Sequence, residues 1–440
     1  GGAAADRYAM IGLGGSQSNA VVDGLVSVEA AGMIEIFGGS GADAFAQIGH
    51  GGRSTTGATT GAVSVISGGT LNLAGGGAGS HAQIGHGGSQ SSGAVVGAVT
   101  VHSVDTLSLG AGTGSWSHAR IGHGARLNTG DKTGEVKVSV SDGDLLLQGN
   151  APQYAYAQIG HGATFESHTA VNADGDICVD VGGKISLGVS TGSGGSGGHA
   201  QIGHGARRMD GSHVGDITVV SGTNAALGGG IALRGAVTSG ASRFAQIGHG
   251  GVYSAGAMSG DISVVALNGG SVTLVGGTQQ IHSAAMIGHG ESGGLSTGTR
   301  EGGIHIFADD KIETIGAYTS VTHLSGTGLS AGNYLGGNGF QLVANGGSSF
   351  RNQANTADSN EALRGLATMV DGNFAGGPVN FAFSNAIDIV VGADQHRSVN
   401  TADGFHLLTG GNITMLSGHQ NAGSGDVTLV AGWNGVGSVS

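Results

Sequence analysis

The chain of 440 residues contains two prolines and one cysteine, and only 10% of its residues are charged. A disulfide framework is excluded, because Cys178 has no second cysteine to pair with. A collagen triple helix is excluded as well, because glycine does not recur at every third position. No apolar run approaches the length of about 18 residues that a transmembrane helix needs, so the sequence predicts no membrane span.

Basic residues are also scarce. Sixteen Lys and Arg stand against 29 Asp and Glu, which gives a formal net charge of −13 at pH 7. Nucleic acids and anionic membranes attract positively charged surfaces, so this balance argues against both as partners. The chain begins with Gly-Gly-Ala and shows neither an initiator methionine nor a signal peptide. We therefore expect a mature or excised piece of a longer protein.

Glycine is the abundant residue, with 95 copies. Each glycine inside a helix costs about 1 kcal/mol relative to alanine, so a helical protein is disfavoured. The hydrophobic fraction of 38% is too high for a disordered polar linker. The composition therefore favours β-structure with many turns.

The string Ala-Gln-Ile-Gly-His-Gly, or a close variant, occurs eight times. Its fifth position serves as a marker, and successive markers lie 36 to 45 residues apart. The markers are Leu13, His50, His86, His123, His161, His204, His249 and His289. Self-similarity at such a period is typical of stacked repeats, in which each unit contacts only its neighbours.

Two short alternating segments follow each motif, for example Val63/Val65 and Leu71/Leu73. Apolar residues two apart, flanked by Gly, Ser, Thr and Asn, indicate strands buried on one face, so each repeat is predicted to hold three strands. The connector after the marker has a constant length in most repeats, which favours coils stacked in register. We predict an all-β, right-handed, three-sided parallel β-helix, or β-solenoid, with one 36–45-residue repeat per coil and glycine at its tight corners.

Three regions are expected along the chain. Residues 1–310 form regular coils with the repeated motif, residues 311–385 form an irregular insertion or decorated coils, and residues 386–440 resume the β-helix with shorter coils. Aromatic residues gather in the middle region, and residues 351–371 carry the only plausible helical period.

The seven marker histidines, His50, His86, His123, His161, His204, His249 and His289, are the most conspicuous candidate site. Alternation along the motif places Ala, Ile and His on the inner face and Gln on the outer face. The first copy carries Leu13 in the histidine position, which suits an inward or half-buried position better than a solvated one. No second ligand type accompanies each histidine, so we predict a structural ladder of neutral imidazoles and no metal site. A metal-binding or pH-sensing role is the alternative.

Three aspartates, Asp176, Asp216 and Asp261, recur in the sequence Gly-Asp-Ile at the start of a strand. We predict that they are turn residues whose side chains accept backbone N–H bonds, and a row that binds a cation is the alternative. An ice-binding surface is disfavoured because Lys137 and Cys178 interrupt the outward row of hydroxyls. The Cys178 thiol is expected to be exposed or half-exposed and without a partner.

Catalysis is poorly supported, although parallel β-helices include polysaccharide lyases and glycosidases. Such enzymes need clustered carboxylates, whereas the acidic residues here are scattered. The pattern G-x-S-x-G occurs only within Gly- and Ser-rich runs, such as residues 194–198 and 290–294, and not at a predicted strand-to-helix turn, which a nucleophile elbow needs. The sequence therefore predicts no enzyme, no catalytic residue and no cofactor.

The run YAQIGHGA, followed after a loop by GDICV, and the closing GDVTLVAGW resemble coils of the filamentous-haemagglutinin-type large bacterial exoproteins. These are β-helical adhesins exported by two-partner secretion or as autotransporter passengers, and the resemblance covers residues 8–310 and 385–440. It implies an elongated extracellular or cell-surface scaffold that contacts host-cell or matrix glycans or proteins. Neither end shows a polar cap, so the alternative is a self-assembling fibre subunit that stacks head to tail. A polysaccharide-cleaving enzyme is a third, weaker alternative.

Overall fold

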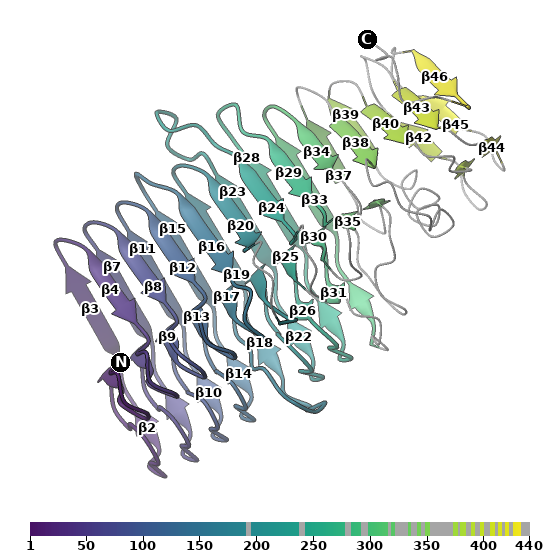
Figure 1. Ribbon diagram of the computed structural model, residues 1–440. Coiled ribbons are helices and arrows are strands. Elements are labelled where there is room, and N and C mark those ends of the chain that lie inside the picture. Colours follow the sequence, from purple (N-terminus) through teal and green to yellow (C-terminus); the bar gives the residue numbers. More distant parts are fainter. Residues whose placement is uncertain are drawn as a thin grey trace.

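The computed structural model describes residues 1–190, 195–236, 243–277, 283–291, 298–315 and 318–321, and mainly short strands between residues 333 and 432. These residues contain no helix and form parallel β-strands stacked coil upon coil (Figure 1). The predicted parallel β-solenoid is confirmed. Each regular coil contributes to four sheets, which we number I to IV in the order in which the chain visits them.

Sheet I is built from the repeated motif, with identical motif positions in register, such as Ile84 beside Ile121. Its strands are β1 (Ala9–Ile11), β5 (Ala46–Ile48), β9 (His81–Ile84), β13 (His118–Ile121), β17 (Tyr156–Ile159), β21 (His199–Ile202), β25 (Phe244–Ile247), β30 (Ala285–Ile287), β35 (Thr319–Val321) and β36 (Asn333–Leu335).

Sheet II is the narrow sheet that the sequence did not predict. Its strands are β2 (Val22–Asp23), β6 (Thr59–Thr60), β10 (Val95–Val96), β14 (Lys132–Thr133), β18 (Ala173–Asp174), β22 (His213–Val214), β27 (Met258–Ser259) and β32 (Arg300–Glu301). The expectation of three strands per coil was wrong, because each regular coil has a fourth strand in sheet II. Two residues are too few to show an alternation of period two, so no sequence pattern marks them.

Sheet III follows directly and carries the first of the two alternating segments predicted for each repeat. Its strands are β3 (Val26–Ala30), β7 (Val63–Ser67), β11 (Val99–Ser103), β15 (Val136–Val140), β19 (Ile177–Val181), β23 (Ile217–Ser221), β28 (Ile262–Ala266), β33 (Ile304–Ala308), β37 (Gln341–Ala344) and β39 (Asn373–Gly376).

Sheet IV closes each coil and is the longest sheet. Its strands are β4 (Ile34–Phe37), β8 (Leu71–Ala74), β12 (Leu107–Gly110), β16 (Leu145–Gly149), β20 (Ile185–Val189), β24 (Ile231–Arg234), β29 (Val272–Val275), β34 (Ile312–Ile315), β38 (Ser348–Asn352), β40 (Val379–Phe383), β43 (Phe405–Thr409) and β46 (Val427–Val430).

Three further pairs of strands complete the described elements. They are β26 (Gly250–Gly251) with β31 (Gly290–Glu291), β41 (Ile389–Val391) with β44 (Ile413–Met415), and β42 (Arg397–Val399) with β45 (His419–Asn421). Sheets III and IV thus contain strands from the region 311–385, in which an insertion or decorated coils were expected. The predicted helical segment, residues 351–371, lies outside the described residues except for its first two positions, Arg351 and Asn352, which belong to β38.

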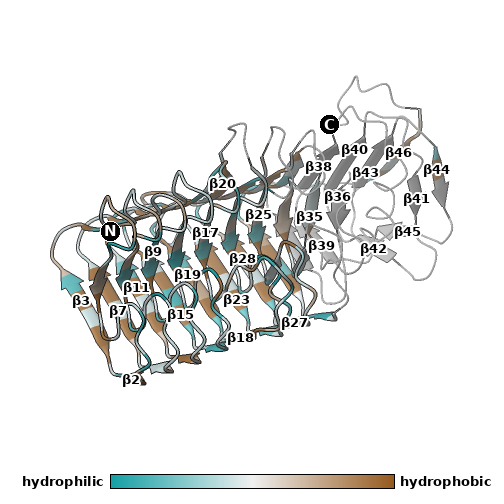
Figure 2. Cartoon of the chain, turned by 60° about the horizontal axis from the view of Figure 1, so that its bottom comes forward, coloured by the Kyte–Doolittle hydropathy of each residue, from teal (hydrophilic) through white to brown (hydrophobic). Residues whose placement is uncertain are grey.

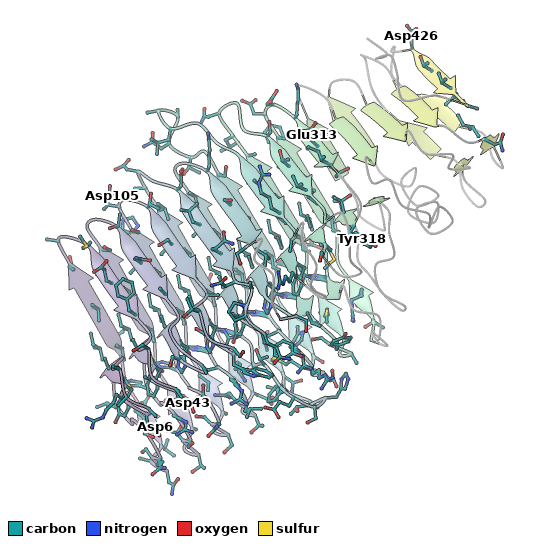
Figure 3. The ribbon with its side chains drawn as sticks, viewed as in Figure 1. Asp6, Asp43, Asp105, Glu313, Tyr318 and Asp426 are labelled. Carbon is teal, nitrogen blue, oxygen red and sulfur yellow. The ribbon has the colours of Figure 1, made fainter. Side chains whose placement is uncertain are left out.

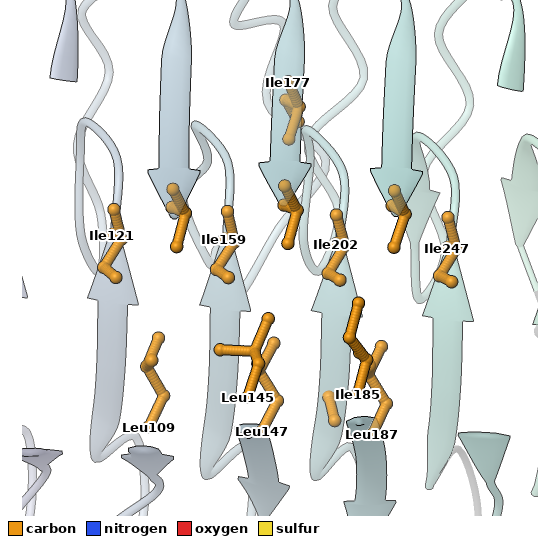
Figure 4. Close-up of a cluster of buried hydrophobic side chains, with 14 of the residues drawn as sticks. Leu109, Ile121, Leu145, Leu147, Ile159, Ile177, Ile185, Leu187, Ile202 and Ile247 are labelled. Carbon is orange, nitrogen blue, oxygen red and sulfur yellow. The ribbon is translucent and has the colours of Figure 1, made fainter. Parts of the chain in front are cut away.

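The hydrophobic core fills the space between sheets I, III and IV. Isoleucine, leucine and valine side chains from these sheets stack on the same residue types in the next coil, as Ile121 does with Ile159 and Leu147 with Leu187 (Figure 4). The apolar bands therefore recur at the same level of successive coils (Figure 2). Each fully buried side chain contributes roughly 1.5 to 3 kcal/mol, so the identical filling of every coil stabilises the whole stack.

The corners use more than glycine, contrary to the sequence expectation. Among the described residues, twelve that are not glycine have a positive φ angle between 51° and 65°. Most of them occupy two loops, one before and one after the sheet I strand. The backbone N–H of Trp116, for example, donates to the carbonyl of Gln153 one coil further on, and the N–H of Tyr154 donates to Ser196. The coil-to-coil hydrogen bond offsets the cost of about 1 to 2 kcal/mol that a side chain incurs in this conformation.

Candidate functional site

The seven marker histidines form a continuous column inside the corner that follows sheet I. Successive imidazole rings are parallel within 8°, and their centroids lie 4.5 to 5.1 Å apart from His50 to His289. All seven side chains are buried. The spacing equals that of neighbouring strands, because each ring projects from the same position of one coil.

Hydrogen bonds fix one tautomer for every ring in the column. The Nδ1 atom of each histidine accepts the backbone N–H of the marker residue in the preceding coil, as His86 accepts from His50 at 2.8 Å. The Nε2 atom faces a glycine carbonyl before sheet III, as in His86 to Gly61 at 2.8 Å. A carbonyl only accepts, so Nε2 carries the hydrogen and the imidazole is neutral.

This arrangement matches the structural ladder that we predicted from the motif. Both nitrogens of each ring are occupied by backbone groups, so no lone pair is left for a metal ion. Burial lowers the pKa of His86 and His204 to about 4 and that of His123 to about 3, and it lowers the pKa of His161 and His249 well below the usual value of histidine. The column therefore resists protonation at neutral pH.

The three predicted turn aspartates lie one above another between sheets II and III. The Oδ1 atom of Asp176 accepts the backbone N–H of Asp216 at 2.9 Å, and Oδ1 of Asp216 accepts that of Asp261 at 2.8 Å. Asp261 in turn accepts the N–H of Gly303 at 2.7 Å. Each aspartate side chain thus accepts a backbone N–H of the next coil at the turn, as predicted from the sequence. Within the described residues, no three His, Cys, Asp or Glu side chains converge as a metal site.

Cys178 lies on the outward face of β19 and is partly exposed. Burial and the neighbouring Asp180 raise the pKa of its thiol. A protonated thiol is a poor nucleophile, so this cysteine has no features of a reactive one.

The motif glutamines contradict the sequence expectation of an exposed outer face. They point away from the main core but are at most 2% exposed, and Nε2 of Gln83 donates to the carbonyls of His86, Gly87 and Gly122 at 3.0 to 3.2 Å. Arg120 replaces glutamine in one coil and is equally buried, hydrogen-bonded to Gln158 and Tyr156. The reason is that the loops on both sides of sheet I fold over its outer face.

A second ring column lies under these loops, and the sequence analysis missed it. It is formed by the residue before Ala-Gln-Ile in each motif, with centroids 4.7 to 5.1 Å apart and planes parallel within 6°. Its members are Tyr8, Phe45, His81, His118, Tyr156, His199 and Phe244. The recurrence of an aromatic ring or histidine at this motif position was the available signal.

Lys132, in sheet II, is fully buried close to the marker histidines, and its charge lowers the pKa of His123. Its Nζ atom donates to the carbonyl of Gly130 at 2.6 Å and to two oxygens of Asn128 at 3.2 Å. No carboxylate is among these partners. Burial, with the nearby charge of Arg120, lowers the pKa of Lys132 to about 7.

Replacing Lys132 with Met, the residue that occupies the same position in β27, is expected to stabilise the protein at pH 6 by roughly 2 kcal/mol. The folded pKa lies below the unfolded value of about 10.4, so the lysine reduces stability below pH 7, and stability recovers as the pH rises from 7 to about 10. The advantage of Lys132→Met should therefore shrink at pH 9. Urea unfolding at both pH values measures it.

The matched control is Lys137→Met, because Lys137 is exposed and paired with Glu135. It should change the unfolding free energy by less than about 0.5 kcal/mol at either pH. A lower stability of Lys132→Met at pH 6 would contradict the expected cost of the buried ammonium group.

The two loops that cover sheet I meet each other along the solenoid and form what we call the loop seam. At the N-terminal coils the seam is closed by ion pairs, from Arg53 to Asp6 at 2.7 Å and to Asp43 at 3.2 Å. Asp6 and Asp43 come from equivalent loops of successive coils (Figure 3). Further along, aromatic rings replace these aspartates at Trp116 and Tyr154.

Guanidinium groups pack on these aromatic rings. Arg126 lies 4.7 Å from the ring centre of Trp116, and Arg207 lies 4.1 Å from that of Tyr154. The rings of Trp116 and Tyr154 are themselves 4.4 Å apart. One coil further, Arg208 lies 5.7 Å from the ring of Tyr253. Such contacts are worth about 0.5 to 2 kcal/mol each, so they hold the arginines in fixed orientations.

A pocket of about 170 Å³ opens in the seam at this point. It is lined by Tyr154, Ser196, Gly197, Arg207, Arg208, Val252 and Tyr253. The lining combines three hydroxyl groups, two guanidinium groups and apolar ring carbons. We call it the seam pocket, and its mixed polar and apolar lining is of the kind found in small-ligand sites.

Comparisons with protein-family models, with curated proteins and with solved structures find no match for this chain. In the described part of the chain, no helix has the length and apolar character that crossing a membrane requires.

Proposed function

We propose that this chain is a non-enzymatic, extracellular shaft of a bacterial surface or secreted exoprotein, with a structural and adhesive role. The observation that supports it is the use of polar side chains for stacking. Marker histidines, motif glutamines and turn aspartates all donate to or accept from a neighbouring coil. Side chains that an enzyme would need for chemistry are thus engaged in holding coils together.

The shape supports the same role. Eight regular coils at about 4.8 Å per strand give a rod of roughly 38 Å before the later strands are added. Outward loops recur on every coil, so the rod presents a repeated surface on a rigid frame. The resemblance of its coils to those of filamentous-haemagglutinin-type exoproteins supports an adhesive setting.

Two measurements on the purified chain test this proposal. Small-angle X-ray scattering should give the asymmetric distance distribution of a rod, and a compact globular distribution would contradict the shaft. Beads coated with the chain should adhere to cultured cells or to extracellular matrix, whereas beads coated with albumin should not. Equal adhesion of the two kinds of bead would refute the adhesive part.

End-to-end self-assembly is the second candidate, and it would act through the surface of the first coil of this sequence. Ile11 and Leu13 are 53% and 57% exposed, whereas the equivalent Ile48 and His50 are 4% and 2% exposed beneath the neighbouring coil. A coil from a second copy would cover these side chains and pair with the open strand edges.

Replacing Ile11 with Asp is expected to abolish any concentration-dependent association, because a carboxylate at the coil end opposes burial. Sedimentation velocity over a hundredfold concentration range measures it. The matched control is Val21→Asp, at a first-coil position that is 72% exposed on the flank. Association that survives Ile11→Asp would argue against stacking through this end.

A further inference from the structure

The seam pocket contains polar groups that the protein itself does not satisfy. Arg207 is 6% exposed, and its Nη1 donates to the carbonyl of Phe165. Its Nε–H is buried and has no acceptor within the described residues, and the same is true of Nε in Arg208, the other arginine of the pocket lining. An unsatisfied buried donor costs about 1 to 3 kcal/mol, so an acceptor supplied by a ligand would recover this energy.

Positive charge is concentrated here, in a chain that is strongly acidic overall. Arg126, Arg207 and Arg208 lie within the same part of the seam, and Glu166 pairs with Arg126 at 2.6 Å. Glu166 itself is 63% exposed, so it screens Arg126 weakly. Arg208 donates to the backbone carbonyl of Glu166, and no carboxylate is among its partners in the described residues. The pocket is therefore suited to an anion.

The remaining lining indicates what else the anion carries. Tyr154, Tyr253 and Ser196 place hydroxyl groups around the pocket, and ring carbons with Val252 provide apolar surface. A bare inorganic anion would use neither the hydroxyl groups nor the apolar surface. A carboxylated sugar presents a carboxylate for bidentate contact with a guanidinium, hydroxyls for hydrogen bonds and a C–H face for the apolar carbons. The volume corresponds to about six water molecules at ~30 Å³ each, which suits one sugar unit.

We propose that the seam pocket binds one uronic acid unit of an acidic glycan, with the Arg207 and Arg208 guanidinium groups on the carboxylate and Tyr154 and Tyr253 beside the ring. The glycan chain would continue along the seam toward Trp116 and Arg126. This assignment rests on the adhesive role proposed above and names its ligand class. A nucleic acid is the competing anionic polymer, and the probes described below distinguish it from the glycan.

Isothermal titration of the whole chain with a short oligogalacturonate tests the proposal. Arg208→Gln and Tyr253→Ala should each weaken binding at least tenfold, and binding should weaken as salt rises. Arg207→Gln should abolish binding, and thermal melting shows whether this buried position still folds. The matched control is Arg53→Gln, because Arg53 occupies the loop position of Arg207 four coils earlier and pairs with Asp6 and Asp43. It should bind like the unchanged chain.

Three further probes distinguish the ligand classes. A neutral oligogalactoside of equal length, inorganic phosphate and poly(dT) should all bind at least tenfold more weakly than oligogalacturonate. Tighter binding of poly(dT) or of phosphate would overturn the proposal, as would oligogalacturonate binding that Arg208→Gln and Tyr253→Ala leave unchanged. A chain that scatters as a rod but binds no oligogalacturonate would overturn the ligand assignment and leave the shaft intact.

Discussion

Acidification from pH 7.5 to 4.5 is expected to lower the melting temperature of the chain steeply. The buried imidazoles are neutral in the fold, and each Nδ1 faces a backbone N–H. Protonation would set one donor against another and place like charges about 5 Å apart in a desolvated column. Unfolding relieves both effects, because the rings then reach water.

The sign of the pH dependence follows from the pKa values. The unfolded pKa of histidine is about 6.5, whereas the folded pKa is about 4 for His86 and His204 and about 3 for His123. Below pH 6.5 the unfolded chain therefore binds more protons, and the free energy of unfolding falls until the folded pKa is reached. Each ring loses at most roughly 3 kcal/mol between pH 6.5 and 4, and above pH 6.5 the contribution is fully present.

Two variants separate the column from other titrating groups. His123→Leu copies the leucine found at Leu13, and it should be less stable at pH 7.5 but lose less stability on acidification. His168→Gln removes an exposed histidine that contacts Asp210, and it should leave the pH profile unchanged. Differential scanning calorimetry from pH 7.5 to 4.5 measures all three proteins. A melting temperature that stays constant between pH 7.5 and 5 would refute the proposed role of the column.

The sequence predicted the parts of the fold that recur with a readable period. Alternation at Val63/Val65 and Leu71/Leu73 identified sheets III and IV, and the constant marker spacing identified the stacking. The leucine at Leu13 correctly indicated that the histidine position is buried. Sheet II escaped because two residues, such as Thr59 and Thr60, carry no period.

The candidate site could not be predicted from periodicity, and the physical reason is a different one. Gln83 was expected to be exposed, because alternation distinguishes two faces of a strand but says nothing about loops that fold over one of them. The seam pocket depends on such loops, since Tyr154 and Arg207 come from different coils and meet only in the stack. Lysine is rarely buried completely, so nothing in the sequence around Lys132 predicts that its side chain is buried.

The substitution with the largest expected effect on folding is Gly122→Ala, in the central motif of the stack. Gly122 has a φ of +137°, and a Cβ atom there would collide with the backbone carbonyl of Gly160 in the next coil. A backbone carbonyl bonded in the same ladder cannot move aside as a flexible side chain can. We expect a loss of at least about 4 kcal/mol, or no soluble folded protein.

The matched control is Gly110→Ala in β12, where a Cβ atom meets no heavy atom within 4 Å and where the paired coil already has Ala74. Its unfolding free energy should change by less than about 0.5 kcal/mol, or rise slightly, because alanine restricts the unfolded chain. Urea unfolding followed by circular dichroism measures both variants. Coils contact only their neighbours, so a defect at Gly122 should also divide the single transition into two, one for the coils on each side. A Gly122→Ala variant that unfolds in one transition at the original midpoint would show that the close approach of glycine backbones does not hold the coils together.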